Sequence, residues 1–156
     1  MLSNNSLEFK DVTAFVNYDK KTLPLSDWIL VTQEMINDFA SATLDKQWVH
    51  VDVEKAKRES PYGCTIAHGF MSVSLLSKFL GDLIHIKSLK MGLNYGLNSV
   101  RFINPVLVNR QLRLKSVIKA IEPHKNGIKV IFSCTVEIKG EEKPACVAEF
   151  LALFIE

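Results

Sequence analysis

Residues 65–83 constrain the fold of this chain more than any other stretch of its sequence. Only Lys78 and Asp82, near the end of the segment, carry charge. Apolar residues fall on nearly every side of a helix, and small residues fill most other positions: Ile66, Ala67, Gly69, Phe70, Met71, Ser72, Val73, Ser74, Leu75, Leu76, Ser77, Phe79, Leu80 and Leu83. A helix that is apolar all round is a buried helix. The pattern therefore predicts a helix roughly 28 Å long that runs through the middle of a domain.

The sequence after residue 94 predicts the sheet that surrounds this helix. Residues 112–122 and 128–138 contain long apolar runs, and Asn126-Gly127 between them is a tight-turn signal. Residues 140–143 form a second turn signal, and the strongly apolar residues 145–155 follow. Three long strands in sequence predict an antiparallel meander. One long helix wrapped by a curved antiparallel sheet is an α+β layer arrangement.

Length and charge bound the organisation and the partners. A chain of 156 residues predicts one domain over residues 1–156, with residues 1–25 as a weakly patterned lead-in. Its formal net charge of +2 gives no strong field that favours nucleic acid or acidic lipid as a partner. The sequence contains no run of eighteen apolar residues, so no membrane span is expected.

Cysteine usage and the amino terminus predict a cytoplasmic protein. Cys64, Cys134 and Cys146 are scattered and match no metal or redox spacing. An odd number of scattered thiols is typical of a reducing compartment. The first residues, MLSNNSLEFKD, are polar and lack the apolar centre of a signal peptide.

A second helix leads into the stretch DKQWVHVD, residues 45–52. Thr32 is a capping residue at its expected start, and the apolar stripe that follows predicts its end near Leu44. Asp45 and His50 then stand five positions apart. That spacing separates them by about 140° on a helix and puts them on opposite faces of a strand. The two side chains can meet only if the chain turns between them, and the sequence does not decide whether it does.

His68 and Gly69 precede the apolar run of the buried helix. Free N–H groups at a helix start attract developing negative charge, and glycine lets a ligand approach the backbone. A carboxylate and an imidazole facing this helix start would form an acid–base site beside an oxyanion site. Taken singly, however, Asp45 is equally typical of a cap and His50 of a satisfied core residue. The spacing of Asp45, His50 and His68 does not support zinc.

Four blocks of sequence resemble one family: TQEMINDFASATLDKQWVHVD, GCTIAHGFMSVSLL, GLNYGLNSVRFINPV and KPACVAEFL. Together they are similar to the MaoC-like dehydratases, in particular to the NodN-like branch, from Trp28 to about Phe154. The resemblance implies the hotdog fold and (R)-specific hydration of trans-2-enoyl-CoA to (R)-3-hydroxyacyl-CoA. Asp45 and His50 match the ends of the family signature D-x-N-P-x-H, in which Gln47-Trp48 replaces Asn-Pro.

The resemblance also implies residue roles. Asp45 and His50 are expected to be catalytic, the Gly69 N–H to hold the thioester oxygen, and Ser77 to support substrate binding. No metal or redox cofactor is expected, because the substrate itself carries coenzyme A. His68 is expected to serve the fold. A homodimer is expected, with the strand at residues 145–155 as the sheet edge that needs a partner.

Two departures from the family and two other functions stay open. Leu44 and Asn109 stand where relatives usually carry glycine, and a bulky residue such as Leu44 disfavours positive φ. The turn that holds Asp45 is therefore expected to differ from its relatives, or the substrate choice to be altered. The alternative functions are a hotdog acyl-CoA thioesterase and a non-catalytic acyl-thioester-binding protein.

Overall fold

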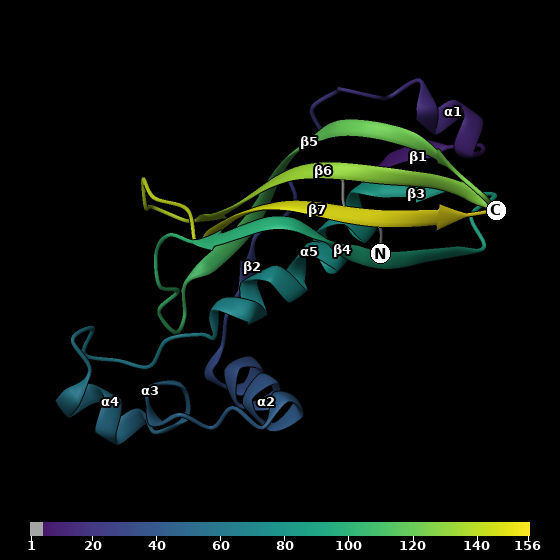
Figure 1. Cartoon of the computed structure of the whole chain (residues 1–156). Helices are drawn as coiled ribbons and strands as arrows, with labels where there is room; N and C mark the ends of the chain where they lie inside the picture. The colour runs from purple at the N-terminus through teal and green to yellow at the C-terminus, as the bar shows by residue number, and fades with distance from the viewer. Residues whose placement is uncertain (1–4) are drawn as a thin grey trace.

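A curved antiparallel sheet wraps around one long helix in the computed structural model, which describes residues 5–156 (Figure 1). The sheet has five strands in the order β2-β5-β6-β7-β4. Their bounds are Ile29–Leu30 for β2, Met91–Phe102 for β4, Gln111–His124 for β5, Gly127–Ile138 for β6 and Cys146–Ile155 for β7. The helix inside the curve is α5, Gly69–Leu83. The α+β prediction and the meander of β5, β6 and β7 are both confirmed.

The sequence explains the regularity of this meander. Buried and less buried residues alternate along β5 and β6, which is the period of a half-buried strand. At the turn between these strands, a Cβ on Gly127 would lie 1.9 Å from the carbonyl oxygen of Phe154. Glycine is therefore required at this position for the turn to lie against β7.

The helix α5 differs from the sequence prediction in length and in burial. It begins at Gly69 because residues 65–67 instead pair with the chain after β4, where the Ala67 N–H donates to the Val106 carbonyl at 2.8 Å. Phe70 is 64% exposed, and Ser74, Ser77 and Gly81 on the same face are also exposed. The prediction of burial on all sides is thus wrong for a single chain, because the sheet curves around only part of the helix.

The open edge of the sheet is also not the predicted one. The apolar strand β7 lies between β6 and β4, so its backbone is paired on both sides. The long edge is β4, which is exposed along nearly its whole length. Most positions of β7 are buried because neighbouring strands and the helix surround it. The expectation that residues 145–155 form the free edge is therefore wrong.

Part of the expected lead-in belongs to the core. The strand β1 (Leu7–Phe9) pairs in parallel with β3 (Ile84–Ile86), directly after α5. The short helix α1 (Val12–Val16) follows, and Phe15 on it is fully buried. Elements this short produce no readable periodicity, so they could not be predicted from the sequence. Residues 1–4, on which part of the signal-peptide expectation rests, lie outside the described residues.

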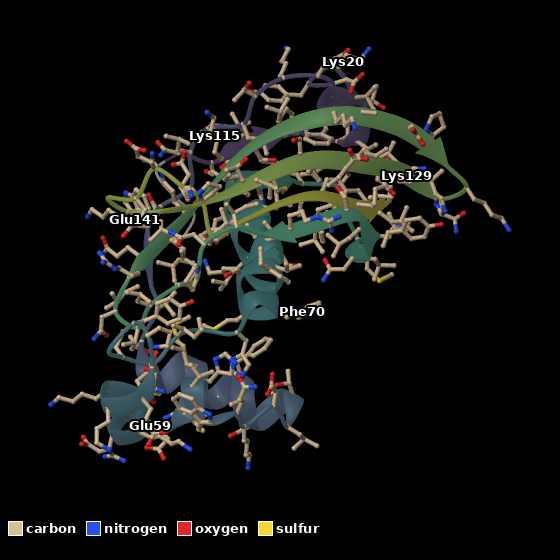
Figure 2. The ribbon with its side chains drawn as sticks, turned by 60° about the vertical axis from the view of Figure 1, so that its left-hand side comes forward. Lys20, Glu59, Phe70, Lys115, Lys129 and Glu141 are labelled. Atoms are coloured by element: carbon tan, nitrogen blue, oxygen red, sulfur yellow. The ribbon has the colours of Figure 1, made fainter. Side chains whose placement is uncertain are left out.

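Three short helices form a separate layer beyond the amino-terminal end of α5 (Figure 1). They are α2 (Gln33–Thr43), α3 (Trp48–Val51) and α4 (Val53–Glu59). Figure 2 shows Phe70 at the end of α5 that faces this layer, with Glu59 in the layer itself. Asp45 and His50 therefore belong to the layer that covers the helix start. Of the helices in residues 5–156, none has the length and apolar character needed to span a membrane.

Candidate active site

The turn that carries Asp45 is made by a residue in the left-handed region. The helix α2 starts at the predicted cap, where Thr32 Oγ1 accepts from the Met35 N–H at 3.2 Å, and it ends at Leu44 with φ of 64°. The Leu44 side chain is 80% exposed, so no packing holds it in this conformation. Asn109 likewise has φ of 65°. Both residues keep a backbone that glycine would adopt more easily, so the substitution of Leu44 for glycine leaves the turn left-handed.

His50 is held on α3 by contacts on several sides. Its Nδ1 lies 2.7 Å from the Ile66 carbonyl oxygen, and its own carbonyl accepts from Gln33 Nε2 at 2.8 Å. A carbonyl can only accept, so Nδ1 carries the proton in the neutral imidazole and Nε2 keeps a lone pair. The His50 ring is therefore oriented as a proton acceptor at Nε2.

His68 contacts both catalytic candidates. Its Nε2–H donates to the Asp45 carbonyl oxygen at 2.9 Å, and its ring stacks on the His50 ring with centroids 3.8 Å apart. The side chain is buried, and His68 occupies the N-cap position of α5 without making a side-chain capping hydrogen bond. The sequence predicts a role in the fold for His68, and its spacing does not show these contacts, because they form only when the chain folds residues 45–50 back over the helix start.

The structure brings the predicted pair together. Ligating atoms of Asp45, His50 and His68 all lie within 4.8 Å of one another. The Asp45 carboxylate is 58% exposed, so it reaches solvent while the two imidazoles are buried. A zinc ion bound at about 2.0–2.1 Å needs ligand atoms roughly 3.5 Å apart that point at one centre. The rings of His50 and His68 are stacked at an interplanar angle of 25°, and His68 Nε2 is engaged with the Asp45 carbonyl oxygen, so in this arrangement that nitrogen is not free to bind a metal.

A cavity of about 310 Å³ joins His50 to the start of α5. Gly69 is the first residue of the helix, and N–H groups of a first turn have no partner within the helix. A Cβ on Gly69 would lie 3.0 Å from the ring of Phe102, which also lines the cavity. The cavity therefore presents an imidazole and helix-start N–H groups to the same space, beneath an aromatic wall. Asp45 is not among the residues that line it.

Ser77 lies elsewhere in this chain. Its Oγ donates to Asn94 Oδ1 at 2.9 Å, and it lines a different, mainly apolar cavity with Leu80 and Phe150. Eight residues of helix separate Ser77 from Gly69, which is about 12 Å. Its supporting role in substrate binding stays a prediction.

Sequence reasoning missed Gln33, and it took Phe102 as a core candidate that could also line the acyl-binding space. Gln33 accepts from Thr65 Oγ1 at 2.5 Å and donates to the His50 carbonyl, so it ties α2 to both parts of the site. A polar residue in the first turn of a helix gives no signal of such a role. Phe102 reads as core in the sequence, yet it is 45% exposed and covers Gly69.

The thiols lie away from this chemistry. Burial raises the pKa of Cys134 to about 12 and that of Cys146 to about 11. Both thiols therefore stay protonated near neutral pH, and neither is a thiolate nucleophile. The third cysteine, Cys64, is partly exposed and belongs to a surface cavity beside Thr65.

A carboxylate and a histidine pair at the start of a helix inside a curved sheet form a candidate acid–base site. The chain belongs to the MaoC-like dehydratase family, since the family model described as MaoC like domain matches residues 15–138. The enzyme 3-hydroxyacyl-thioester dehydratase Z of Mycobacterium tuberculosis is 46% identical over 131 residues, 83% of this chain and 86% of that protein. Nodulation protein N of Rhizobium meliloti is 38% identical over 151 residues, 96% of this chain and 92% of that protein.

A solved structure supports the fold. The unliganded R-hydratase PhaJ1 from Pseudomonas aeruginosa superimposes with a TM-score of 0.71 at 20% identity, covering 87% of this chain and 83% of that one. At this level of identity the match concerns the fold alone. It confirms the hotdog prediction that the sequence blocks implied.

Proposed function

We propose that this chain is a hydro-lyase that adds water to trans-2-enoyl-CoA to give (R)-3-hydroxyacyl-CoA, or removes it in reverse. The observation that carries the proposal is the fixed ring of His50, whose Nδ1–H is bound to the Ile66 carbonyl so that Nε2 keeps its lone pair, in one cluster with the Asp45 carboxylate. A binding protein needs no such pair. The names of the dehydratase and R-hydratase relatives agree with this reaction.

The reaction follows from these groups. A water molecule held by Asp45 and His50 attacks C3 of the enoyl thioester, and His50 Nε2 takes the proton that the water loses. Electrons of the C2–C3 double bond move toward the thioester carbonyl, whose oxygen becomes enolate-like. The Gly69 N–H and the positive end of the α5 dipole stabilise that oxygen. The enolate then collapses as C2 receives the proton, which restores both acid–base groups.

Two further expectations, on cofactors and on location, accompany this proposal. Proton transfer and an oxyanion site suffice for the hydration, so the reaction requires neither metal nor redox cofactor, and coenzyme A arrives with the substrate. We expect the protein to work in the cytoplasm, because all three cysteines, Cys64, Cys134 and Cys146, are free thiols.

We further propose that the protein is a homodimer. The edge strand β4 exposes large apolar side chains, with Leu93 at 42%, Tyr95 at 58% and Leu97 at 39%. The exposed face of α5 lies beside it, as Ser74 and Tyr95 line one groove. An exposed apolar edge strand is an aggregation hazard unless a second sheet pairs with it. Sedimentation at low micromolar concentration tests this, and a stable, fully active monomer would refute it.

One assay tests the function. Hydration of a ladder of trans-2-enoyl-CoA lengths is followed by loss of the enoyl thioester absorbance, with a thiol reagent in parallel to detect thioesterase activity.

Asp45→Asn and His50→Gln should each lower kcat by roughly 10²- to 10⁴-fold while the fold is kept. His85→Gln, at an exposed histidine on β3, is the matched control. Near-normal turnover in either folded variant would remove that residue from the mechanism, and release of free thiol would favour the thioesterase.

A further inference from the structure

His68 lies where it can couple the two catalytic candidates. Only 4% of the residue is exposed, and it sits at the boundary between the loop before α5 and the helix itself. One nitrogen donates to the backbone of Asp45 and one ring face packs on His50. Asp45 lies at one end of the turn at residues 45–47, and His50 lies beyond its other end. His68 contacts both.

The contact with His68 matters more for holding Asp45 in place than for holding His50. His50 has other anchors, since Ile66 holds its ring and Gln33 holds its carbonyl. Asp45 is an exposed turn residue, and its other backbone hydrogen bond in the described part of the chain is a long one, 3.5 Å from its N–H to Thr43 Oγ1. The bond from His68 is therefore the main tie between the Asp45 backbone and the start of α5.

The other nitrogen of His68 argues against a purely structural role. Its Nδ1 is buried and has no hydrogen-bond partner within residues 5–156. A buried polar atom without a partner destabilises the fold. An aromatic ring alone would fill the same space and stack on His50 without that penalty. What histidine adds here is the single donor, Nε2–H, aimed at Asp45.

We propose that His68 is a positioning residue whose Nε2–H holds the Asp45 turn in register with His50 and the start of α5. The inference rests on the proposed hydratase function. His68 transfers no proton to substrate, and its effect is to set where the Asp45 carboxylate stands. A misplacement of about 1 Å in such a group can reduce turnover by as much as about 10²-fold.

Two substitutions separate this role from a structural one. His68→Phe keeps a ring that can stack on His50 and removes both nitrogens. His68→Gln places an amide N–H near the position of Nε2 and removes the ring. We expect His68→Phe to unfold at nearly the same urea concentration as the parent while its kcat falls about 10- to 100-fold with little change in KM. We expect His68→Gln to unfold earlier and to keep kcat within about threefold of the parent.

Amide hydrogen exchange gives a readout that does not depend on turnover. Loss of the bond to Asp45 should loosen the turn at residues 45–47, and a hydrogen-bonded amide that reports this turn is the His50 N–H, which donates to the Gln47 carbonyl at 3.0 Å. Exchange of the His50 amide should speed up by as much as about tenfold in His68→Phe, and much less in His68→Gln. His85→Phe is the control. If turnover in the two variants follows their stability, or if exchange of the His50 amide is unchanged in His68→Phe, the positioning role is refuted. If exchange responds as expected but the parent hydrates no enoyl thioester, the positioning holds and the proposed function fails instead.

Discussion

Replacing Leu44 by glycine should make this protein more stable, although glycine usually destabilises. Leu44 ends α2 with φ of 64°, directly before the candidate catalytic residue Asp45. A residue with a Cβ in this region is disfavoured by roughly 1–2 kcal/mol, and glycine is not. Two opposing terms reduce the gain, one from the unfolded chain and one from the lost side chain.

Both opposing terms are small at this position. Glycine gives the unfolded chain more conformational freedom, and this lowers the free energy of unfolding by roughly 0.4–1 kcal/mol. Leu44 is 80% exposed, so only about a fifth of it is buried. Full burial of a leucine side chain stabilises by about 2 kcal/mol, so removing this one costs only about 0.4 kcal/mol. The net effect of Leu44→Gly is a stabilisation of about 0.5 kcal/mol. Leu44→Ala keeps the Cβ and therefore the backbone strain, so it loses only the stabilisation from side-chain burial.

The comparison of these two variants is the decisive measurement. Leu44→Gly should be about 1 kcal/mol more stable than Leu44→Ala, which is about 2–4 °C in Tm for a chain of this size. Thermal and urea unfolding should be measured at one fixed protein concentration, since the proposed dimer makes stability depend on concentration. A glycine variant that is equal to or less stable than the alanine variant would show that the turn is not strained, and the reasoning from φ would fail.

Three further predictions concern the cavity and the thiols. Gly69→Ala should lower kcat/KM by at least about tenfold with a small change in Tm. The added Cβ would meet the Phe102 ring at 3.0 Å and force that ring into the cavity. Unchanged kinetics would contradict this prediction. The raised pKa values of Cys134 and Cys146, about 12 and about 11, mean that folding favours their protonated forms. Their contribution to stability should therefore be complete below pH 9 and be lost as the pH rises toward 11–12, with urea midpoints as the measure. In the native protein at pH 8, a thiol reagent should label Cys64 alone, and rapid labelling of all three cysteines would contradict the burial.

Local chemistry in the sequence was enough to predict several elements. Thr32 and the stripe after it predicted α2 from its cap to Leu44, because capping and helical periodicity act within a few residues. The turn at Asn126-Gly127 and the alternation on both sides predicted the β5–β6 hairpin for the same reason. The family blocks then implied the hotdog fold and singled out Asp45, His50 and Gly69.

Only the tertiary structure decided how these pieces meet. No sequence period shows that residues 65–67 pair with the chain after β4, and this pairing delays the start of α5 to Gly69. Strand order is equally hidden, since a strand's own pattern does not reveal which neighbours it has. The apolar β7 therefore looked like an edge, whereas β4 is the edge. The contact between His68 and Asp45 spans 23 positions and depends on a left-handed residue that the sequence disfavours. The site is assembled by packing between distant segments, and that packing is what the local sequence does not record.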